Sequence, residues 1–503
     1  MSQLTRTQLN ALVASLPGNN SVKRHVSAMS AHATIDAPQV YTHLETDSRK
    51  VDPYGIFFAL PGVSSHGWDY LDDVVALGCR LAIVPMNISV QRDDIELIAV
   101  QDPAALLVAC LHRYFGHMPA HMVAVTGTNG KSSICYYIAQ LASNLGCKSG
   151  LVGTFGVGPL SSLKEATQTT PDILSLHQTL MKMSASGVDF VAFEASSHAL
   201  DQGRIEGVPF QTAVFSNLSR DHLDYHGGME NYAHAKRRLF AFDSVKQSVI
   251  CLDDDYADFM AAACSQSERL YYSVFNTSAD FFVKDLSFDA SGCRFMLCHP
   301  GGGTPVCLPL LGQFNVQNAL AAVASLWQDT VDKQALIDGL SLLQGAPGRM
   351  EKVQRPNAPL AVIDYAHTPD ALALALQALK AHSKNRVICV FGCGGDRDRG
   401  KRPEMMEAAL KWADHVWLTS DNPRTESIEQ IFADTLAGVK KEAVYSFEVD
   451  RRRAISQAIL SASPDDIVLI AGKGHETYQD VQGVKHSFDD KEEALIAIEA
   501  YAN

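Results

Sequence analysis

The stretch His121–Ser133, HMVAVTGTNGKSS, decides the fold of the chain around it. Met122–Val125 is apolar and β-prone and predicts a short buried strand, and a helical pattern follows as far as Leu145. Gly127 and Gly130 lie in the turn between the two and permit backbone conformations that other residues resist. The stretch therefore predicts a strand, a glycine-flanked loop and a helix in succession.

The predicted loop is suited to bind the phosphates of ATP. Consecutive backbone N–H groups and the positive end of a helix meet at one point there, where anions bind well. Lys131 would contact the β- and γ-phosphates, and the Ser132 hydroxyl would ligate Mg²⁺. The position five before Gly130 is Val125 rather than the glycine of a complete Walker A motif. An ordinary glycine-rich turn is the alternative, but Gly-Lys-Ser between a strand and a helix favours ATP binding.

Length, charge and composition limit what the chain can be. Its 503 residues are too many for one hydrophobic core, and about three domains are expected. A net charge of −14 argues against nucleic acid as the main partner. No apolar run reaches the length of a membrane span, and the N-terminal residues lack the core of a signal peptide. The eleven cysteines include no CxxC pair, so we expect a cytoplasmic protein without membrane insertion.

The segment before residue 119 carries a polar loop that is able to contact a nucleotide or a sugar. Phe57–Leu60 predicts a buried strand, and Pro61–Gly67 (PGVSSHG) predicts the loop that leaves it. Small polar side chains in such a loop let a ligand approach closely. A surface turn, with Asp47 and Arg49 as a structural ion pair, is the alternative that the sequence leaves open.

Two strand ends in the middle segment carry candidate metal ligands. Val188–Phe193 is apolar except for Asp189 and ends at Glu194, and Thr212–Phe215 leads into NLSRDHLDYH at 217–226. Ligands gather at the carboxyl edge of a parallel sheet, so these carboxylates and histidines are expected near the metal of the nucleotide. Lys236 lies in a predicted helix beside two arginines, where a solvated basic face is the default interpretation.

The segment after residue 348 alternates strands and helices, as in a Rossmann-like sheet. Four predicted strands end in polar loops, which are DYAHTP after 360–363, GCGGDRDRGKR after 387–391, SDNPRTE after 416–419 and GKGHE after 467–471. In a parallel sheet these loops lie on one edge. We therefore expect one mostly basic rim, suited to an anionic second substrate, with the members Arg397, Arg424, Lys473, His475 and Glu476.

The motifs resemble those of the Mur ligases, which are ATP-dependent amide-forming enzymes of peptidoglycan synthesis. The resemblance spans the whole chain in order and spacing, and its motifs are DSR, FFALPG, TGTNGKSS, QTTPD, EASSHALDQGR, NLSRDHLDYH, YAHAK, GQFNVQN, APGRME, YAHTPD, FGCGGDRDRGKRP, SDNPR and GKGHE. Several are particular to the branch that adds the third amino acid of the stem peptide. The resemblance implies an α/β chain of three domains: a small α/β domain for the UDP substrate (1–118), a central P-loop ATP-binding parallel-sheet domain (119–348) and a Rossmann-like domain for the amino acid (349–503).

The resemblance implies a catalytic site with ATP and two Mg²⁺ ions. Lys131 would contact phosphate, Glu194 would share the first Mg²⁺ with Ser132, and His222 would bind the second. Lys236 is carbamylated in the family (N6-carboxylysine), because an ammonium repels a metal whereas a carbamate is an anionic oxygen ligand. Where the family usually has threonine, this chain has Ser132-Ser133, which keeps the hydroxyl. The implied ATP contacts are Gly127, Thr128, Asn129, Gly130, Lys131, Ser132, Ser133, Asn318, Arg349 and Asp364.

The resemblance also implies where two further substrates bind. The uridine end of UDP-MurNAc-L-Ala-D-Glu would contact Thr46, Ser48, Val63, Ser64 and Ser65. Its sugar and peptide end would contact Gln168, Thr169, Thr170, Ser196, Gln202 and Arg204. The incoming amino acid would contact Arg397, Asp421, Asn422, Pro423, Arg424, Gly472 and Glu476. Because this last set lies on a different domain from the nucleotide, closure of that domain is expected to assemble the site.

The sequence DNPR at 421–424 favours meso-diaminopimelate as the incoming amino acid. Ligases of the family that use diaminopimelate carry this motif, whereas lysine-adding relatives lack its arginine. Diaminopimelate is lysine with an extra carboxylate, to which the planar Arg424 guanidinium offers two parallel donors. With lysine, this arginine would have no carboxylate to pair with.

The implied reaction has two steps. The γ-carboxylate of the D-glutamyl residue attacks the γ-phosphate of ATP to give an acyl phosphate and ADP, and the diaminopimelate amine then displaces phosphate. Two Mg²⁺ ions and Lys131 would neutralise the charge where the two anions meet. We expect the protein to be a monomer. The alternatives are a lysine-adding ligase, a folylpolyglutamate synthetase, an ATP-hydrolysing conformational switch and a binding protein with a degenerate site.

Overall fold

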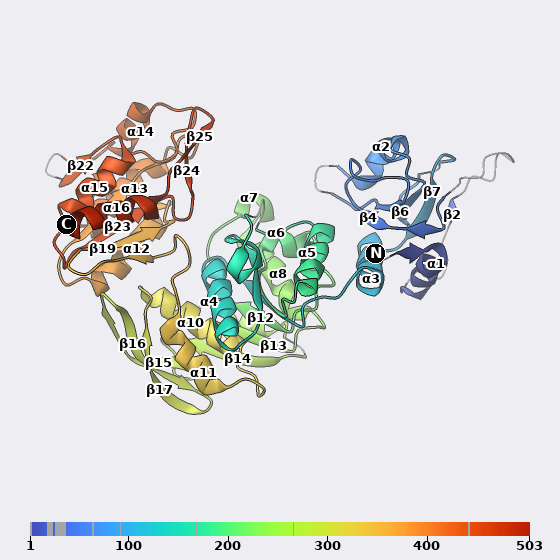
Figure 1. The fold of residues 1–503 in the computed structure, drawn as a ribbon, viewed down its shortest axis with the longest axis horizontal. Coiled ribbons are helices and arrows are strands. Elements are labelled where there is room, and N and C mark those ends of the chain that lie inside the picture. Colours follow the sequence, from blue (N-terminus) through green and yellow to red (C-terminus); the bar gives the residue numbers. More distant parts are fainter. Residues whose placement is uncertain are drawn as a thin grey trace.

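The computed structural model describes residues 3–17, 24–25, 37–62, 65–90, 92–165, 169–264, 266–440 and 443–502. Its strands form three large sheets that follow one another along the chain, with helices packed against them (Figure 1). The N-terminal part lies on one side of the middle part and the C-terminal part on the other (Figure 1). The predicted α/β fold class is confirmed.

The middle sheet has ten strands and carries the glycine-rich loop. From β9 to β15 in spatial order its strands run parallel, whereas β10 at one end and β16 and β17 at the other are antiparallel to their neighbours. The stretch around residues 121–133 forms β8, the loop and the start of α4 (Lys131–Asn144), as predicted. In spatial order the strands are β10 (Gly156–Pro159), β9 (Ser149–Gly153), β11 (Phe190–Glu194), β8 (His121–Thr126), β12 (Thr212–Phe215), β13 (Gln247–Cys251), β14 (Glu268–Ser273), β15 (Phe281–Asp289), β16 (Gly292–His299) and β17 (Gly302–Leu308).

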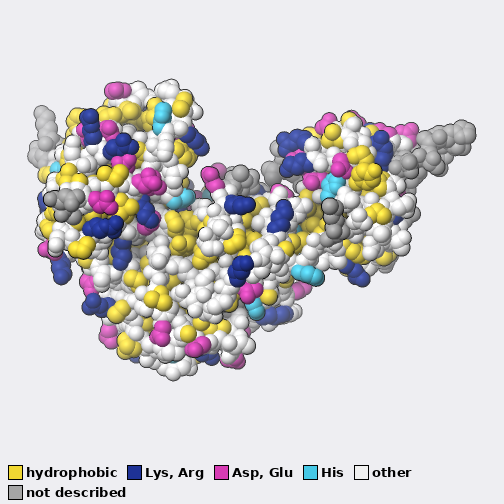
Figure 2. Space-filling model, viewed as in Figure 1, with side chains coloured by type: hydrophobic (Ala, Val, Ile, Leu, Met, Phe, Trp, Pro, Cys, Tyr) yellow, Lys and Arg dark blue, Asp and Glu magenta, His cyan; other side chains and the backbone are white. Residues whose placement is uncertain are grey.

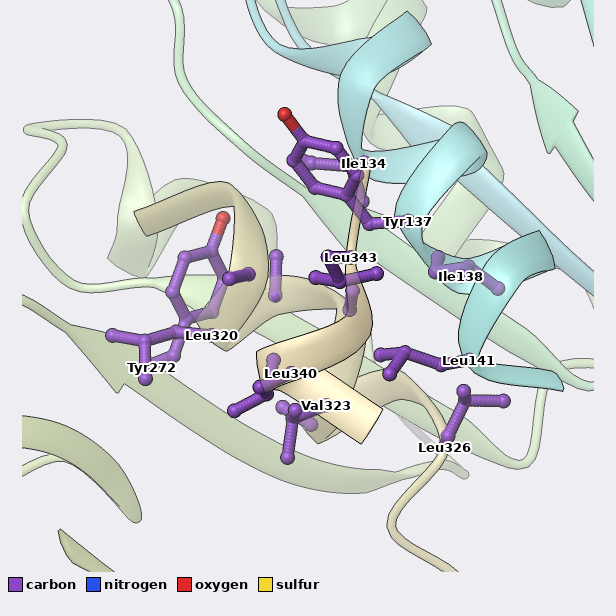
Figure 3. Close-up of a cluster of buried hydrophobic side chains, with 14 of the residues drawn as sticks. Ile134, Tyr137, Ile138, Leu141, Tyr272, Leu320, Val323, Leu326, Leu340 and Leu343 are labelled. Atoms are coloured by element: carbon purple, nitrogen blue, oxygen red, sulfur yellow. The ribbon is translucent and has the colours of Figure 1, made fainter. Parts of the chain in front are cut away.

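The glycine-rich loop is supported by a helix pair with an apolar interface. Helix α4 directs Ile134, Tyr137 and Leu141 toward α10 (Gln313–Ser325), which contributes Leu320 (Figure 3). All four side chains are buried, and burial of an aliphatic side chain of this size stabilises the fold by about 2 kcal/mol. The pair therefore fixes the start of α4, and with it the loop that precedes the helix.

The C-terminal sheet has six strands, and only its edge strand β18 is antiparallel to its neighbour. Its spatial order is β18 (Glu351–Val353), β19 (Leu360–Asp364), β23 (Ile467–Ala471), β20 (Val387–Phe391), β21 (His415–Leu418) and β22 (Tyr445–Phe447). The four strands that end in polar loops are therefore parallel neighbours whose loops share one edge, as predicted. One face of the sheet packs on α12 (Pro369–His382), α13 (Lys401–Trp412) and α14 (Ile428–Thr435), and the other on α15 (Arg451–Leu460) and α16 (Asp490–Ala502).

The N-terminal sheet has five strands, in the order β2 (Arg24–His25), β7 (Glu96–Val100), β6 (Leu81–Pro85), β5 (Gly55–Phe58) and β4 (His43–Glu45). It packs with α1 (Arg6–Ser15), α2 (Leu71–Ala76) and α3 (Pro103–Tyr114). Helix α3 also contacts α5 (Ile173–Ala185) of the middle part and so joins the two parts. In the described part of the chain, no helix has both the length and the apolar character needed to cross a bilayer.

A buried histidine joins the C-terminal part to the middle part. His382 of α12 accepts the N–H of Gly312 at Nε2 (2.8 Å), and its Nδ1 donates to the carbonyl oxygen of Asp289 (2.7 Å). Burial lowers the pKa of this imidazole, which favours the neutral form that these two hydrogen bonds require. Away from this contact, the surface is hollowed between the N-terminal and C-terminal parts, over the middle part (Figure 2).

Candidate functional site

The loop after β8 forms the base of a cavity of about 430 Å³. Gly127 has a φ of +150°, and a Cβ atom there would lie 1.9 Å from the Ser216 hydroxyl oxygen, so the position requires glycine. Lys131 donates from Nζ to the carbonyl oxygens of Gly127 (3.0 Å) and Thr128 (2.8 Å), and burial lowers the pKa of its ammonium. A phosphate is a stronger partner for this ammonium than a neutral carbonyl.

Glu194 and Ser132 form the centre of a candidate Mg²⁺ site. The Glu194 carboxylate, at the end of β11, accepts the Ser132 hydroxyl (2.9 Å), the Thr154 N–H (2.7 Å) and the Thr154 hydroxyl (3.2 Å). Burial raises the pKa of this carboxyl, because its charged form loses solvation. A cation would compensate for that loss, and carboxylate and hydroxyl oxygens are ligands that Mg²⁺ prefers. The residues present therefore fit a first Mg²⁺.

His222 lines the same cavity at a strained backbone position. Its φ is +52°, which is uncommon for a residue other than glycine and is typical of functional sites. Its Nε2 lies 3.4 Å from an Asp221 carboxylate oxygen, and its ring centroid lies 4.9 Å from that of His198. Within the described ranges, no three His, Cys, Asp or Glu side chains form a ready-made metal cage. A second Mg²⁺ at His222 would therefore also need oxygen ligands from the nucleotide or from a modified side chain.

Lys236 is buried, so the solvated basic face that the sequence alone favoured is wrong for this residue. Its side chain is 1% exposed on α8 (Met229–Arg237), and its Nζ donates to the carbonyl oxygen of Gly127 (2.7 Å). The ring of Tyr232 lies 4.5 Å from Nζ. Burial, followed by the nearby Lys131 ammonium, lowers the pKa of Lys236 well below its usual value. More of this amine is therefore neutral at pH 7 than of an exposed lysine.

The other predicted ATP contacts reach the same cavity from α10 and from the C-terminal part. Asn318 lies against the loop, since a Cβ atom at Gly130 would be 2.6 Å from its Oδ1. Arg349 lies 4.6 Å from the centroid of the Tyr365 ring, and burial raises the pKa of the neighbouring Asp364 carboxyl. The predicted residues that line this cavity are Thr128, Asn129, Gly130, Lys131, Ser132, Ser133, Thr169, Glu194, Ser196, His222, Lys236, Asn318, Arg349 and Asp364.

The predicted contacts for the peptide end of the UDP substrate form one hydrogen-bonded group beside this cavity. Arg204 donates from Nε to Gln202 Oε1 (2.7 Å) and from Nη1 to the carbonyl oxygen of Thr170 (3.0 Å). The Thr170 hydroxyl donates to the carbonyl oxygen of Glu194 (3.1 Å) and lies 3.3 Å from the Ser196 hydroxyl. The group therefore connects the expected substrate side to the expected metal side through the backbone of residue 194.

A separate cavity of about 540 Å³ lies in the N-terminal part. Arg49 and Asp47 line this cavity and form a bidentate ion pair, with both N–O distances at 2.9 Å. The pair lowers the pKa of the Asp47 carboxyl. The structural ion pair thus exists together with a cavity able to take a ligand. The predicted uridine contacts that line this cavity are Thr46, Ser48 and Ser65. Three predicted contacts, Val63, Ser64 and Gln168, lie outside the described residues.

The loops of the C-terminal sheet enclose a third cavity, of about 350 Å³. Arg424 donates from Nη1 to the carbonyl oxygen of Gly395 (2.6 Å), and no carboxylate of the described residues forms an ion pair with it. In contrast to Arg424, Arg402 is buried, and its guanidinium forms ion pairs with Glu426 and Asp434, each at 2.7 Å. Of the predicted amino-acid contacts, Pro423 does not line this cavity, and those that do are Arg397, Asp421, Asn422, Arg424, Gly472 and Glu476.

Lys473 and His475 do not belong to the exposed rim that the sequence predicts. Lys473 is fully buried, and the His475 ring packs edge-on against Phe155 of the middle part, with centroids 5.6 Å apart. The backbone explains the difference: a Cβ atom at Gly348 would lie 2.2 Å from the backbone of residue 474. The GKGHE loop therefore packs against the linker that precedes the C-terminal sheet, which turns two polar side chains inward.

Several lining residues carried little signal in the sequence. Thr154 follows the end of β9, so the edge argument that identified Glu194 would also have identified it once this strand was recognised. Apolar side chains that line a cavity look like core residues in a sequence and could not have been identified. The further residues of the three cavities include Thr154, Tyr232, Phe314, Gln317, Leu374 and Tyr70, together with Asn217, His66, Tyr365, Lys401 and Arg402, which lie in polar loops that the sequence predicts at strand ends.

Two family models match the chain. The model described as Mur ligase middle domain matches residues 125–326, and the model described as Mur ligase, glutamate ligase domain matches residues 348–474. Together they cover more than half of the chain. The matched ranges include the glycine-rich loop, Glu194, His222 and Lys236, as well as the DNPR loop at 421–424.

Similar proteins cover nearly the whole chain. A Pseudomonas syringae pv. tomato protein named UDP-N-acetylmuramoyl-L-alanyl-D-glutamate--2,6-diaminopimelate ligase is 41% identical over 481 residues, which is 95% of this chain and 98% of that protein. A Pseudomonas aeruginosa protein of the same name is 43% identical over 91% of this chain and 95% of that protein. A solved structure under this name has a TM-score of 0.73 at 42% identity, covering 94% and 98%. A MurF ligase from Thermotoga maritima in complex with ADP, at 17% identity and a TM-score of 0.56 over 91% and 97%, shows a shared fold alone.

Proposed function

The chain belongs to the Mur ligase family, and we propose that it adds meso-diaminopimelate to UDP-MurNAc-L-Ala-D-Glu, with cleavage of ATP to ADP and phosphate. The new amide joins the diaminopimelate amine to the γ-carboxylate of the D-glutamyl residue, as a step of peptidoglycan synthesis. The names of relatives that are 41% and 43% identical support this reaction. The three sheets support domains at 1–118, 119–348 and 349–503, in a protein that we expect to be a cytoplasmic monomer.

One observation carries the choice of amino acid. Arg424 lines the C-terminal cavity and is held by a neutral carbonyl, without an ion-paired carboxylate among the described residues. Diaminopimelate brings a second carboxylate that a guanidinium can bind through two parallel hydrogen bonds. Lysine lacks this group and would leave the arginine charge without a partner. The cavity therefore favours diaminopimelate over lysine.

The nucleotide cavity supports the first step, transfer of the γ-phosphoryl group to the substrate carboxylate. Lys131 exchanges its two carbonyl partners for phosphate oxygens and reduces the repulsion between the two anions. Ser132 and Glu194, which are hydrogen-bonded to each other, would hold the first Mg²⁺, and His222 would hold the second. Bound Mg²⁺ supplies charge neutralisation and orients the phosphates. Arg204, Gln202 and Thr170 fix the peptide end beside Glu194.

Lys236 is proposed to carry a carbamate. Its neutral amine would add to carbon dioxide and release one proton, which replaces a buried neutral amine by a carbamate anion. The lowered pKa supports this step, since only the neutral amine is a nucleophile. The carbamate oxygens would lie near Lys131 and would complete the ligands for the second Mg²⁺.

The second step requires the amino acid and the acyl phosphate to meet, although they bind different parts of the chain. Arg349 and Asp364 belong to the C-terminal part and already line the nucleotide cavity. Asp364 ends β19, and the neighbouring strands carry the loops that enclose the amino-acid cavity. We infer that the C-terminal part closes over the hollow in Figure 2 when substrates bind, which also excludes water from the acyl phosphate.

The test is product formation by the purified chain with ATP, Mg²⁺, UDP-MurNAc-L-Ala-D-Glu and meso-diaminopimelate. Mass spectrometry is expected to detect the nucleotide-linked tripeptide, with one ADP released for each product. Steady ATP hydrolysis that no amino acid stimulates, without a tripeptide, would contradict the proposal and favour a nucleotide-driven switch. Product formation with L-lysine in preference to diaminopimelate would retain the ligase and reject the role of Arg424.

A further inference from the structure

A buried lysine lies directly behind the wall of the amino-acid cavity. Lys473 is 0% exposed and does not line the cavity, whereas Asn422 and Glu476, which do line it, are its hydrogen-bond partners. Its Nζ donates to Asn422 Oδ1 at 3.2 Å and to Glu476 Oε2 at 3.4 Å. A buried ammonium is costly unless it is paired, so this position needs a reason beyond packing.

The contacts of Asn422 give such a reason. Its Oδ1 accepts a second hydrogen bond, from the backbone N–H of Asp480 (2.9 Å), while its Nδ2 donates to Glu476 Oε2 (3.0 Å). A carboxamide can be turned by 180° with little change in shape, which exchanges its donor and its acceptor. Turned over, the NH₂ group of Asn422 would face the Lys473 ammonium and the N–H of Asp480, and its oxygen would face the Glu476 carboxylate. Lys473 therefore helps to select one orientation of the amide.

The backbone of the DNPR loop, which carries Asn422, is held by groups other than Lys473. A hairpin of β24 (Tyr478–Val481) and β25 (Val484–Ser487) packs beside this loop. The N–H of Arg424 donates to the carbonyl oxygen of Asp480 in β24 (3.0 Å). Gln479 donates from Nε2 to the carbonyl oxygen of Asp421 (2.9 Å). The hairpin thus fixes the path of the DNPR loop and shares the Asn422 oxygen, whereas Lys473 contacts the side chains of both Asn422 and Glu476.

We propose that Lys473 is a positioning residue for the amino-acid substrate, which it serves by orienting the Asn422 amide and the Glu476 carboxylate from behind the cavity wall. In this orientation Asn422 offers N–H groups, which suit a substrate carboxylate, and Glu476 offers an acceptor, which suits a substrate ammonium. The inference rests on the proposed function, because it assigns these two residues to an amino acid that carries both groups.

The test compares steady-state kinetics of Lys473→Met and Lys473→Gln with those of the unchanged chain. Loss of one charged hydrogen-bond donor predicts a rise in KM for diaminopimelate of about tenfold. KM for ATP and kcat are expected to change by less than about twofold, because Lys473 lines neither the nucleotide cavity nor the amino-acid cavity. Lys473→Arg, which keeps a cationic donor, is expected to lie closer to the unchanged chain than either neutral variant. An unchanged KM for diaminopimelate in the neutral variants would overturn the proposal.

Lys485→Met is the matched control. Lys485 is exposed, and its Nζ lies 4.0 Å from the centroid of the Tyr478 ring, against 5.5 Å for Lys473, so the variant removes a nearby cation without touching Asn422. It is expected to leave KM for diaminopimelate unchanged. An equal rise in KM for Lys485→Met and Lys473→Met would mean that charge alone acts, and would overturn the orienting role.

A double-mutant cycle tests the route of the effect. If Lys473 acts through the amide, Lys473→Met in an Asn422→Ala background should add less than about twofold to KM for diaminopimelate. Full additivity of the two effects would overturn the proposal. Failure of the proposed function gives a different result, because the unchanged chain would then form no tripeptide with diaminopimelate at all. Thermal unfolding with and without ADP establishes that each variant is folded and still binds nucleotide.

Discussion

The nucleotide half and the amino-acid half of the site hold their charged groups in different ways. The nucleotide half is the cavity above the middle sheet, where Lys131, Glu194 and Lys236 are held by hydroxyls and backbone groups. The amino-acid half is the cavity of the C-terminal rim, where Arg424 and Asn422 are held by neighbouring loops. In the first half Glu194 and Lys236 are buried, and the pKa values of these two groups and of Lys131 are shifted, whereas in the second half Arg424 is partly exposed.

The two halves are therefore expected to contribute differently to the reaction. Buried charges with weak partners gain most when phosphate and Mg²⁺ bind, so the nucleotide half should control turnover. A partly exposed guanidinium held in place by a carbonyl gains only when a carboxylate of the right geometry arrives, so the amino-acid half should control which substrate is used. Variants in the first half should therefore reduce kcat, and variants in the second should change KM and selectivity.

The largest effect is expected for Lys131→Met. Without this ammonium the developing charge on the γ-phosphoryl group is not neutralised, and kcat should fall about 10³-fold or more. Phosphate release at saturating substrates measures this change. Lys148→Met removes an exposed lysine that directly precedes β9 and should leave kcat unchanged. A Lys131 variant that raises only the KM for diaminopimelate would break the proposed division.

Lys236→Ala is expected to reduce kcat by about 10²-fold, since the proposed carbamate ligand of the second Mg²⁺ would be lost. Added formate, a small anionic oxygen ligand, should restore part of the activity if the missing group is a carbamate. The readout is phosphate release over a range of formate concentrations, with the exposed Arg238→Ala as control. Full activity of Lys236→Ala without formate would contradict a metal-binding role.

Some of this division could be predicted from the sequence. Local sequence patterns predict the Gly-Lys-Ser loop, the strand that ends at Glu194 and the strand that leads into the DNPR loop. In the structure the first two lie at one edge of the middle sheet, and the DNPR loop lies with its neighbours at one edge of the C-terminal sheet. Burial of Lys236 could not be predicted, because NYAHAKRRLF contains basic residues whose exposure depends on contacts distant in the sequence. The inward turn of Lys473 depends in the same way on the close approach of residues 348 and 474.

In the amino-acid half, Arg424→Gln is expected to reduce kcat/KM for diaminopimelate by about 10- to 100-fold, the effect of one lost charge-assisted contact. Activity with L-lysine should not fall, because lysine has no second carboxylate. Kinetics with each amino acid in parallel measure the change. Arg399→Gln is the control, since Arg399 already pairs with Asp434 (2.8 Å). An equal loss with both amino acids would mean that Arg424 does not select the substrate.

The smallest effect on activity is expected for a residue outside both halves. His177 of α5 is 0% exposed and lies between His112 and the backbone of Glu206, and burial lowers its pKa to about 4. Between pH 6.5 and 4 the unfolded chain therefore binds more protons at this residue than the folded chain does. The free energy of unfolding should fall by about 3 kcal/mol as pH decreases through this range.

Urea unfolding at several pH values measures that slope in the unchanged chain and in His177→Gln. The variant should lose much of the slope while keeping kcat and both KM values, because His177 touches neither cavity. The exposed His121→Gln is the control and should keep the slope. Retention of the full slope by His177→Gln would assign the acid sensitivity to other groups.

The most direct test of the account is the ratio of kcat/KM for meso-diaminopimelate to kcat/KM for L-lysine in the unchanged chain. Both are measured by phosphate release with ATP, Mg²⁺ and UDP-MurNAc-L-Ala-D-Glu, and the tripeptide product is verified by mass. We expect a ratio of about 10² or more in favour of diaminopimelate, the value of one bidentate ion pair. A ratio near one, or turnover without any tripeptide, would contradict it.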